Sequence, residues 1–152
     1  MRRIYLLLTI AMLGFFTSCS DSEENNNKMT EEERGVFDYD WGTSMDRVKE
    51  GVATYQTETE DSTLYVLDFK PSCVVSYQFT EGRLSAMAII GPKEQFDDVF
   101  LQHLQSGYTE LGDVTSGKTL YVNDSQGKLM EIVESSHKTK PYYAVGWTKY
   151  SK

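Results

Sequence analysis

The sequence predicts an α+β fold: two helix-plus-three-strand units, a possible tandem repeat, with helices packed on one face of an antiparallel sheet. Three observations support this prediction. Apolar residues recur at helical spacing in two short segments, strand-like alternation follows each segment, and one stretch of the first half matches a stretch of the second at a fixed offset. After the amino-terminal segments about 115 residues remain, which is the usual size of one domain with one hydrophobic core.

The first unit is expected to begin with a short helix over about 44–56. Thr43 or Ser44 is a suitable N-cap, and Val48 and Val52 recur at helical spacing. Clean alternation of apolar and polar residues then predicts strands, with a two-residue hairpin turn between the second and third. The expected strands of this unit are 63–69, 73–80 and 84–90.

The second unit is expected to begin with a helix that Pro92 opens at its first turn. Phe96, Phe100 and Leu104 belong to its apolar stripe, and Gly107 is a suitable C-cap. The expected strands of this unit are 119–123, 129–134 and 142–150. Residues 63–68 and 119–124 match at five of six positions, which supports a repeat.

The first 18 residues predict a signal peptide for export. Arg2 and Arg3 precede an apolar stretch over 4–16, which is shorter than the roughly 20 residues that span a bilayer and has the length of a signal-peptide core. Small residues then precede Cys19, as in the lipobox that this region resembles, although Phe16 stands where that motif usually has leucine. The resemblance implies a bacterial lipoprotein that is cut before Cys19 and lipidated on it.

Residues 19–35 are expected to form the lipidated cysteine and a flexible acidic tether, followed by a single domain over 36–152. The acidic run 20–24 resembles the tract behind the lipidated cysteine in surface-exposed lipoproteins of the Bacteroidetes. This resemblance implies an outer-membrane, lipid-anchored protein on the cell surface; the alternative is a periplasm-facing position.

Gly42, Thr43, Ser44 and Val48, followed by the strand-turn-strand run 77–84, resemble a module of small envelope lipoproteins. The families concerned are the outer-membrane-assembly lipoproteins of the SmpA/OmlA type and the two-repeat beta-lactamase inhibitor proteins. The resemblance covers about 40 residues and implies an interaction module with an αβ fold; it carries over no binding residue.

Charge and cysteine content exclude several classes of function. The formal charge is -8, and removal of Arg2 and Arg3 makes it -8 minus 2, or -10. Nucleic acid and anionic headgroups would be repelled by such a chain. If Cys19 is acylated, Cys73 has no intramolecular disulfide partner, and its place in an apolar strand predicts a small buried side chain.

Residues 112–119 fit the phosphate-binding pattern G-x-x-x-x-G-K-[ST]. That motif needs a helix after the loop, whereas a strand is expected here, so no nucleotide site is predicted. His103 and His137 are the only histidines and belong to no metal-ligand pattern. No metal, no cofactor and no enzymatic activity are therefore expected.

Aromatic residues are the remaining candidates for a site. The possible binding platform comprises Trp41, Tyr142, Tyr143, Trp147 and Tyr150. Core packing is the alternative role for these side chains. The sequence thus predicts a lipid-anchored, non-enzymatic protein-binding or assembly module that contacts an envelope protein through its sheet or an exposed edge. The alternative is a glycan-binding accessory surface lipoprotein that uses the aromatic side chains.

Overall fold

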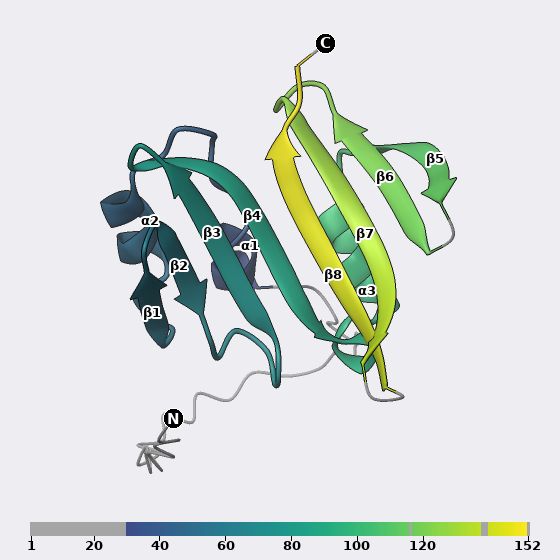
Figure 1. Cartoon of the computed structure of the whole chain (residues 1–152), viewed down its shortest axis with the longest axis horizontal. Coiled ribbons are helices and arrows are strands. Elements are labelled where there is room, and N and C mark those ends of the chain that lie inside the picture. The colour runs from purple at the N-terminus through teal and green to yellow at the C-terminus, as the bar shows by residue number, and fades with distance from the viewer. Residues whose placement is uncertain (1–29, 116, 138–139, 152) are drawn as a thin grey trace, which may run out of the picture.

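The structure, a computed structural model, describes residues 30–115, 117–137 and 140–151. It contains one antiparallel sheet of eight strands in the order β1-β2-β3-β4-β8-β7-β6-β5 (Figure 1). The strands are β1 (Thr57–Glu60), β2 (Thr63–Val66), β3 (Val74–Thr80), β4 (Arg83–Pro92), β5 (Thr109–Thr115), β6 (Lys118–Asn123), β7 (Lys128–His137) and β8 (Lys140–Lys149). The helices of the described part are α1 (Glu31–Gly35), α2 (Met45–Gly51), α3 (Asp98–Gln105) and the 3-10 turn η1 (Lys93–Gln95).

The predicted α+β class, with two helix-plus-three-strand units and helices packed on one face of the sheet, is wrong. The molecule is predominantly β, and its three α-helices have only five, seven and eight residues in the described part. Each half contributes four strands to the sheet, not three. The order runs inward from β1 to β4 and outward from β8 to β5, so the two halves meet along β4 and β8.

The two strands that the sequence did not reveal, β1 and β5, are the edges of the sheet. Strand β1 reads Thr-Glu-Thr-Glu and is exposed at all four positions, so it has no apolar alternation to recognise. Strand β5 shifts register twice against β6, which breaks the two-residue period. Charge and bulges at edge strands hinder pairing with another sheet. In this chain they also remove the alternation of apolar and polar residues by which a strand is predicted from sequence.

The second helix begins later than expected, because β4 continues through Gly91 and Pro92. These residues pair with Tyr143 and Tyr142 of β8 instead of opening a helix. Helix α3 starts at Asp98 after η1, and the Asp97 side chain caps it by accepting a 2.8 Å hydrogen bond from the Phe100 amide. Proline tolerates both a helix start and the end of a strand, so Pro92 alone did not decide between them.

The hydrophobic core lies on one face of the sheet. Leu64, Tyr77, Met87, Trp147 and Met130 form one row of this face across β2, β3, β4, β8 and β7, and all five are buried. Apolar side chains from the segment before α2, from α2 itself and from α3 complete the core. Because side chains alternate along a strand, the neighbouring residues of each strand point to the opposite face.

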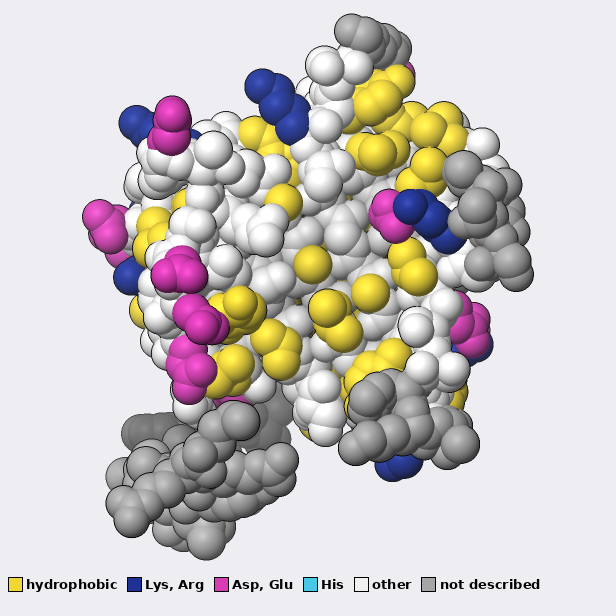
Figure 2. All heavy atoms as spheres, viewed as in Figure 1, with side chains coloured by type: hydrophobic (Ala, Val, Ile, Leu, Met, Phe, Trp, Pro, Cys, Tyr) yellow, Lys and Arg dark blue, Asp and Glu magenta, His cyan; other side chains and the backbone are white. Residues whose placement is uncertain are grey.

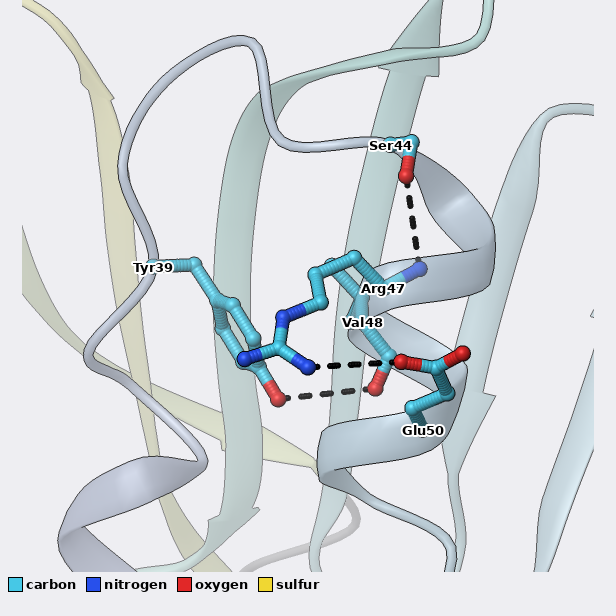
Figure 3. Close-up of polar contacts among 5 residues, drawn as sticks. All are labelled: Tyr39, Ser44, Arg47, Val48 and Glu50. Carbon is cyan, nitrogen blue, oxygen red and sulfur yellow. Dashed lines mark hydrogen bonds and ion pairs between the residues drawn. The ribbon is translucent and has the colours of Figure 1, made fainter.

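Helix α2 is shorter than the expected 44–56, and the loop before it is packed against it. The Ser44 hydroxyl caps the helix by accepting a 3.4 Å hydrogen bond from the Arg47 amide. Tyr39 reaches from the preceding loop and donates a 3.4 Å hydrogen bond to the Val48 carbonyl (Figure 3). A Cβ at Gly51 would collide with the Tyr39 hydroxyl, so this glycine allows the loop to pack closely.

The described structure begins inside the segment that the sequence assigned to the tether. Thr30 and Glu33 form a capping box, in which each residue's side chain accepts a hydrogen bond from the other's backbone amide, at 3.1 Å and 2.7 Å. Helix α1 follows, and Val36, the first residue of the expected domain, is its C-cap and is fully buried.

Candidate functional site

The face of the sheet opposite the core is the candidate site. We call it the open face and define it by three rows that run across the central strands. The first row is Val74, Ile90, Ala144, Val133 and Lys118; the second is Tyr65, Ser76, Ala88, Gly146, Glu131 and Leu120; the third is Gln78, Ala86, Thr148, Leu129 and Val122.

The open face carries apolar side chains in contact with solvent. Ile90 is 51% exposed and Val74 is 37% exposed. Their neighbours in the same strands, Ile89 and Val75, are fully buried on the core face. Small residues such as Ala88 stand in the middle of the rows, on β4 and β8. A protein surface can therefore approach the sheet closely at its centre.

Charge on this face is concentrated away from the centre. Glu58 pairs with Tyr65 and Glu60 with Thr63, so both glutamates lie on the open face at the β1 edge. Figure 2 shows apolar side chains spread across the face and acidic side chains along its left margin. Towards the other edge, the Lys118 ammonium forms a 2.7 Å ion pair with Glu131, which leaves that pair without net charge.

An apolar centre with an acidic margin is suited to binding another protein. The side chains in the three rows are mainly apolar or hydroxyl-bearing, and the two charged ones are paired with each other. Exposed apolar patches with a polar rim are typical of protein–protein contact surfaces. In the sequence this surface is visible only as Ala86, Ala88 and Ile90 at alternating positions, a pattern that an ordinary buried strand shares.

The structure distributes the five aromatic residues of the expected platform over different surfaces. Tyr143 and Trp147 point to the core face, and Trp147 is only 3% exposed; Tyr142 points to the open face. Trp41 and Tyr150 meet at the turn before β7, where the Gly127 carbonyl accepts hydrogen bonds from the Trp41 indole at 3.0 Å and the Tyr150 amide at 2.8 Å.

The histidines and Cys73 occupy separate places. His103 lies in the last turn of α3, where burial and then the charge of Arg34 lower its pKa. Cys73 is fully buried, as its place in an apolar strand predicted, and burial raises the pKa of its thiol. Among the residues that the structure describes, His, Cys, Asp and Glu form no group of three that could hold a metal ion. The side chain of His137 and the predicted lipidation site, Cys19, lie outside the described residues.

The segment with the phosphate-binding pattern joins two antiparallel strands. Its first residues belong to β5, and Lys118 begins β6. A phosphate loop instead runs from a strand into a helix, whose N-terminus faces the phosphate. The Lys118 side chain is also engaged with Glu131 on the open face.

No family model, curated protein or solved structure matches this chain. The resemblances to lipoproteins of the Bacteroidetes, to the SmpA/OmlA type and to beta-lactamase inhibitor proteins therefore stay predictions. In the described part of the chain, every helix is too short or too polar to cross a membrane.

Proposed function

We propose that this chain is a lipid-anchored protein of the cell envelope that binds a protein partner through the open face of its sheet. The partner presents an apolar surface to the centre of the face and basic side chains to its β1 margin. The observation that carries this proposal is the row of Val74, Ile90, Ala144 and Val133, in which apolar side chains stand on a sheet face that the described chain leaves exposed.

The size of the face agrees with this role. In the order of the sheet, the six strands β2, β3, β4, β8, β7 and β6 span about 24 Å across the strands, at a spacing of about 4.8 Å. Along the strands, the three rows with their side chains cover about 20 Å. The face therefore has a flat area of about 500 Å². A partner that covered this face would bury an accessible surface in the range of a small or transient interface. Glu58 and Glu60, in a chain of formal charge -8, favour a partner with complementary basic groups.

The proposed location of the protein is supported by the sequence. Residues 1–18 have the features of a signal peptide and precede Cys19 in a lipobox-like context. Attachment of lipid to Cys19 would place the domain at the outer membrane, on the cell surface or facing the periplasm. The proposal requires no cofactor, metal or nucleotide.

A site-specific photocrosslinker tests the proposed contact surface in living cells. Placed at Ala88, in the middle of the open face, it should give a discrete crosslinked species that contains this chain and an envelope protein. The matched position is Gln102, which is exposed on α3 and should give no such species.

The second arm of the experiment replaces Ile90 by Arg while the crosslinker remains at Ala88. Ile90 is half exposed, so this change should alter stability little but should reduce the crosslinked species at least about tenfold, because it puts a charge into the apolar centre. Crosslinking that is equal at Ala88 and Gln102, or that persists in Ile90→Arg, contradicts the proposal.

A further inference from the structure

A pocket of about 210 Å³ lies between α3 and the strands β6, β7 and β8, and we call it the α3 pocket. Tyr121 and Ile132 line it and pair with Met130 and Val145, which are fully buried in the core. These lining side chains therefore point to the core side of the sheet, away from the open face. Lys118 borders the pocket, but its ammonium is paired with Glu131 on the open face.

The pocket exists because α3 covers this end of the core face only in part. The helix has eight residues, which is a length of about 12 Å, and it turns Phe100 and Leu104 into the core. Leu101 and Gln105, each one position further along the helix, line the pocket instead. Leu101 is partly buried, as are the apolar side chains that the strands contribute, so the lining remains in contact with solvent.

Two tyrosine rings stand in the lining and are held in place by neighbouring side chains. The Tyr121 hydroxyl accepts a 3.2 Å hydrogen bond from the Gln105 amide of α3. The ring of Tyr143 meets that of Phe96 edge-on, with their centres 5.6 Å apart. Tyr143 is also one of the five aromatic residues that the sequence suggested as a binding platform. Fixed aromatic rings offer a flat apolar surface to a ligand at little cost in side-chain entropy.

The polar groups of the lining are an amide, a hydroxyl and a carboxylate, from Gln105, Thr119 and Glu134. The Glu134 carboxylate accepts a 2.9 Å hydrogen bond from the Lys93 ammonium. A carboxylate has about four lone-pair positions, so it can accept from a ligand as well. Between them the three groups can both donate to and accept from ligand hydroxyls.

The charges in and beside the pocket give no positive excess. The pocket and its ion-pair partners carry two lysines and three glutamates, in two ion pairs and one further carboxylate: Lys93–Glu134, Lys118–Glu131 and Glu110. Glu110 acts on the pocket directly, since burial and then its charge raise the pKa of Tyr121. An anionic ligand would be repelled here, so the lining favours a neutral one.

Size and composition together indicate the class of ligand. Drug-sized sites have volumes of about 300–1,000 Å³, so the α3 pocket is suited to one small ring. A neutral sugar unit has an apolar ring face and, around its rim, hydroxyls that donate and accept hydrogen bonds. Aromatic rings beside an amide, a hydroxyl and a carboxylate complement both of these features.

We propose that the α3 pocket binds one neutral sugar unit, whose ring lies against Tyr121 and Tyr143 and whose hydroxyls bond to Gln105, Thr119 and Glu134. This site is independent of the protein contact proposed for the open face. A domain with both sites holds a protein on one side of its sheet and a glycan on the other.

Saturation-transfer difference NMR tests this binding, because it detects weak ligands of a large particle. The full chain with its anchor is held in a detergent that has no sugar headgroup and is titrated with D-glucose, D-galactose and D-mannose. The uronates of these sugars and glycerol are the comparison probes. At least one neutral sugar should bind saturably, with a Kd at least about tenfold below those of its uronate and of glycerol.

Two variants locate the binding in the α3 pocket. Tyr121→Leu keeps an apolar side chain but removes the ring, so it should weaken binding of that sugar about tenfold. Tyr65→Leu is its matched control, since Tyr65 is also half-buried but lies on the open face, and it should leave the Kd unchanged. Gln105→Leu removes the amide and should also weaken binding; Gln102→Leu, at an exposed position of the same helix, should not.

The proposal is overturned by any of three results. The first is a titration in which none of the neutral sugars binds the folded protein. The second is binding of glycerol or of the matching uronate as tight as that of the sugar; for glycerol this would indicate an adventitious additive only. The third is an unchanged Kd in folded Tyr121→Leu or, where that variant does not fold, in Gln105→Leu. None of these results bears on crosslinking at Ala88, so the two proposals fail separately.

Discussion

The hydroxyl of Tyr77, in the middle of β3, donates a 2.7 Å hydrogen bond to the carbonyl oxygen of Val36, 41 residues earlier in the chain. Both residues are fully buried. This bond attaches the segment after α1 to the centre of the sheet. Phe37 and Asp38 of that segment line a cavity of about 220 Å³ on the core side of the sheet, so the same bond helps to hold one wall of this cavity in place.

Removal of this hydroxyl should destabilise the protein. In Tyr77→Phe the ring still fills its place, but the Val36 carbonyl loses its side-chain partner in a buried environment, which should cost about 1–3 kcal/mol of unfolding free energy. Urea denaturation measures the difference. Tyr65→Phe is the matched control on the open face of β2 and should change stability by less than about 0.5 kcal/mol. Equal effects of the two substitutions would contradict a stabilising role for the bond.

The buried tyrosines also predict loss of stability in alkali. Burial raises the pKa of Tyr108 to about 12 and raises that of Tyr77, while an unfolded tyrosine ionises near pH 10. Both hydroxyls therefore hold their protons more tightly in the folded state. The stability that they contribute is complete below pH 10 and is lost as the pH rises through the folded-state values.

Thermal melts at increasing pH test this dependence. The melting temperature should fall more steeply above pH 10, and Tyr77→Phe should show a shallower fall than the unchanged chain, because one raised pKa is gone. A melting temperature that stays level up to pH 12 would exclude this contribution.

The sequence predicted what depends on apolar periodicity. Strands β3 and β4 were placed within one or two residues, because Val75, Tyr77 and Phe79 alternate cleanly and the turn after Thr80 is short. Ser44 was one of two proposed caps, and it is the one that forms the hydrogen bond. These features are local, so a short stretch of sequence contains their whole cause.

Features that depend on distant contacts were not predicted. Strand β1 is a strand because it pairs with β2, and nothing in its own four polar residues requires that structure. The cavity joins Arg34, Lys128 and Trp147, which are separated by many residues and meet only after the sheet has formed. Likewise, the open face can be recognised only once the register places Ile90 beside Ala144.

Gly91 also makes a contact between residues distant in sequence, because it packs closely against Cys73 of the neighbouring strand segment. A Cβ at this position would collide with the Cys73 sulfur and lie 3.2 Å from the Cys73 Cα, so Gly91→Ala should destabilise the protein by about 1–3 kcal/mol. Gly146→Ala on β8 is the matched control, since the nearest of the described atoms to its Cβ would be the Met87 carbonyl oxygen at 3.9 Å.

A double-mutant cycle assigns the cause of the Gly91 effect. Cys73→Ala removes the sulfur that the new methyl group would meet, so the combined variant should lose less free energy than the sum of the two single variants. Strict additivity in chemical denaturation would show that the close approach of Cys73 is not responsible.

The last prediction concerns the anchor. Replacement of Cys19 by alanine removes the only cysteine in the lipobox-like context and therefore the proposed site of acylation. Because buried acyl chains contribute about 0.8 kcal/mol per methylene group to membrane binding, their loss should move the protein from the membrane fraction to the soluble fraction or leave the precursor uncleaved. Metabolic labelling with radioactive palmitate, followed by fractionation and immunoblotting, measures both effects. Cys73→Ala is the matched control: its thiol is buried in the folded domain, so this variant should keep its label and its membrane attachment. Label and membrane retention that are unchanged in Cys19→Ala would show that the protein is held in the envelope by other means, and the anchored part of the proposed function would then be wrong.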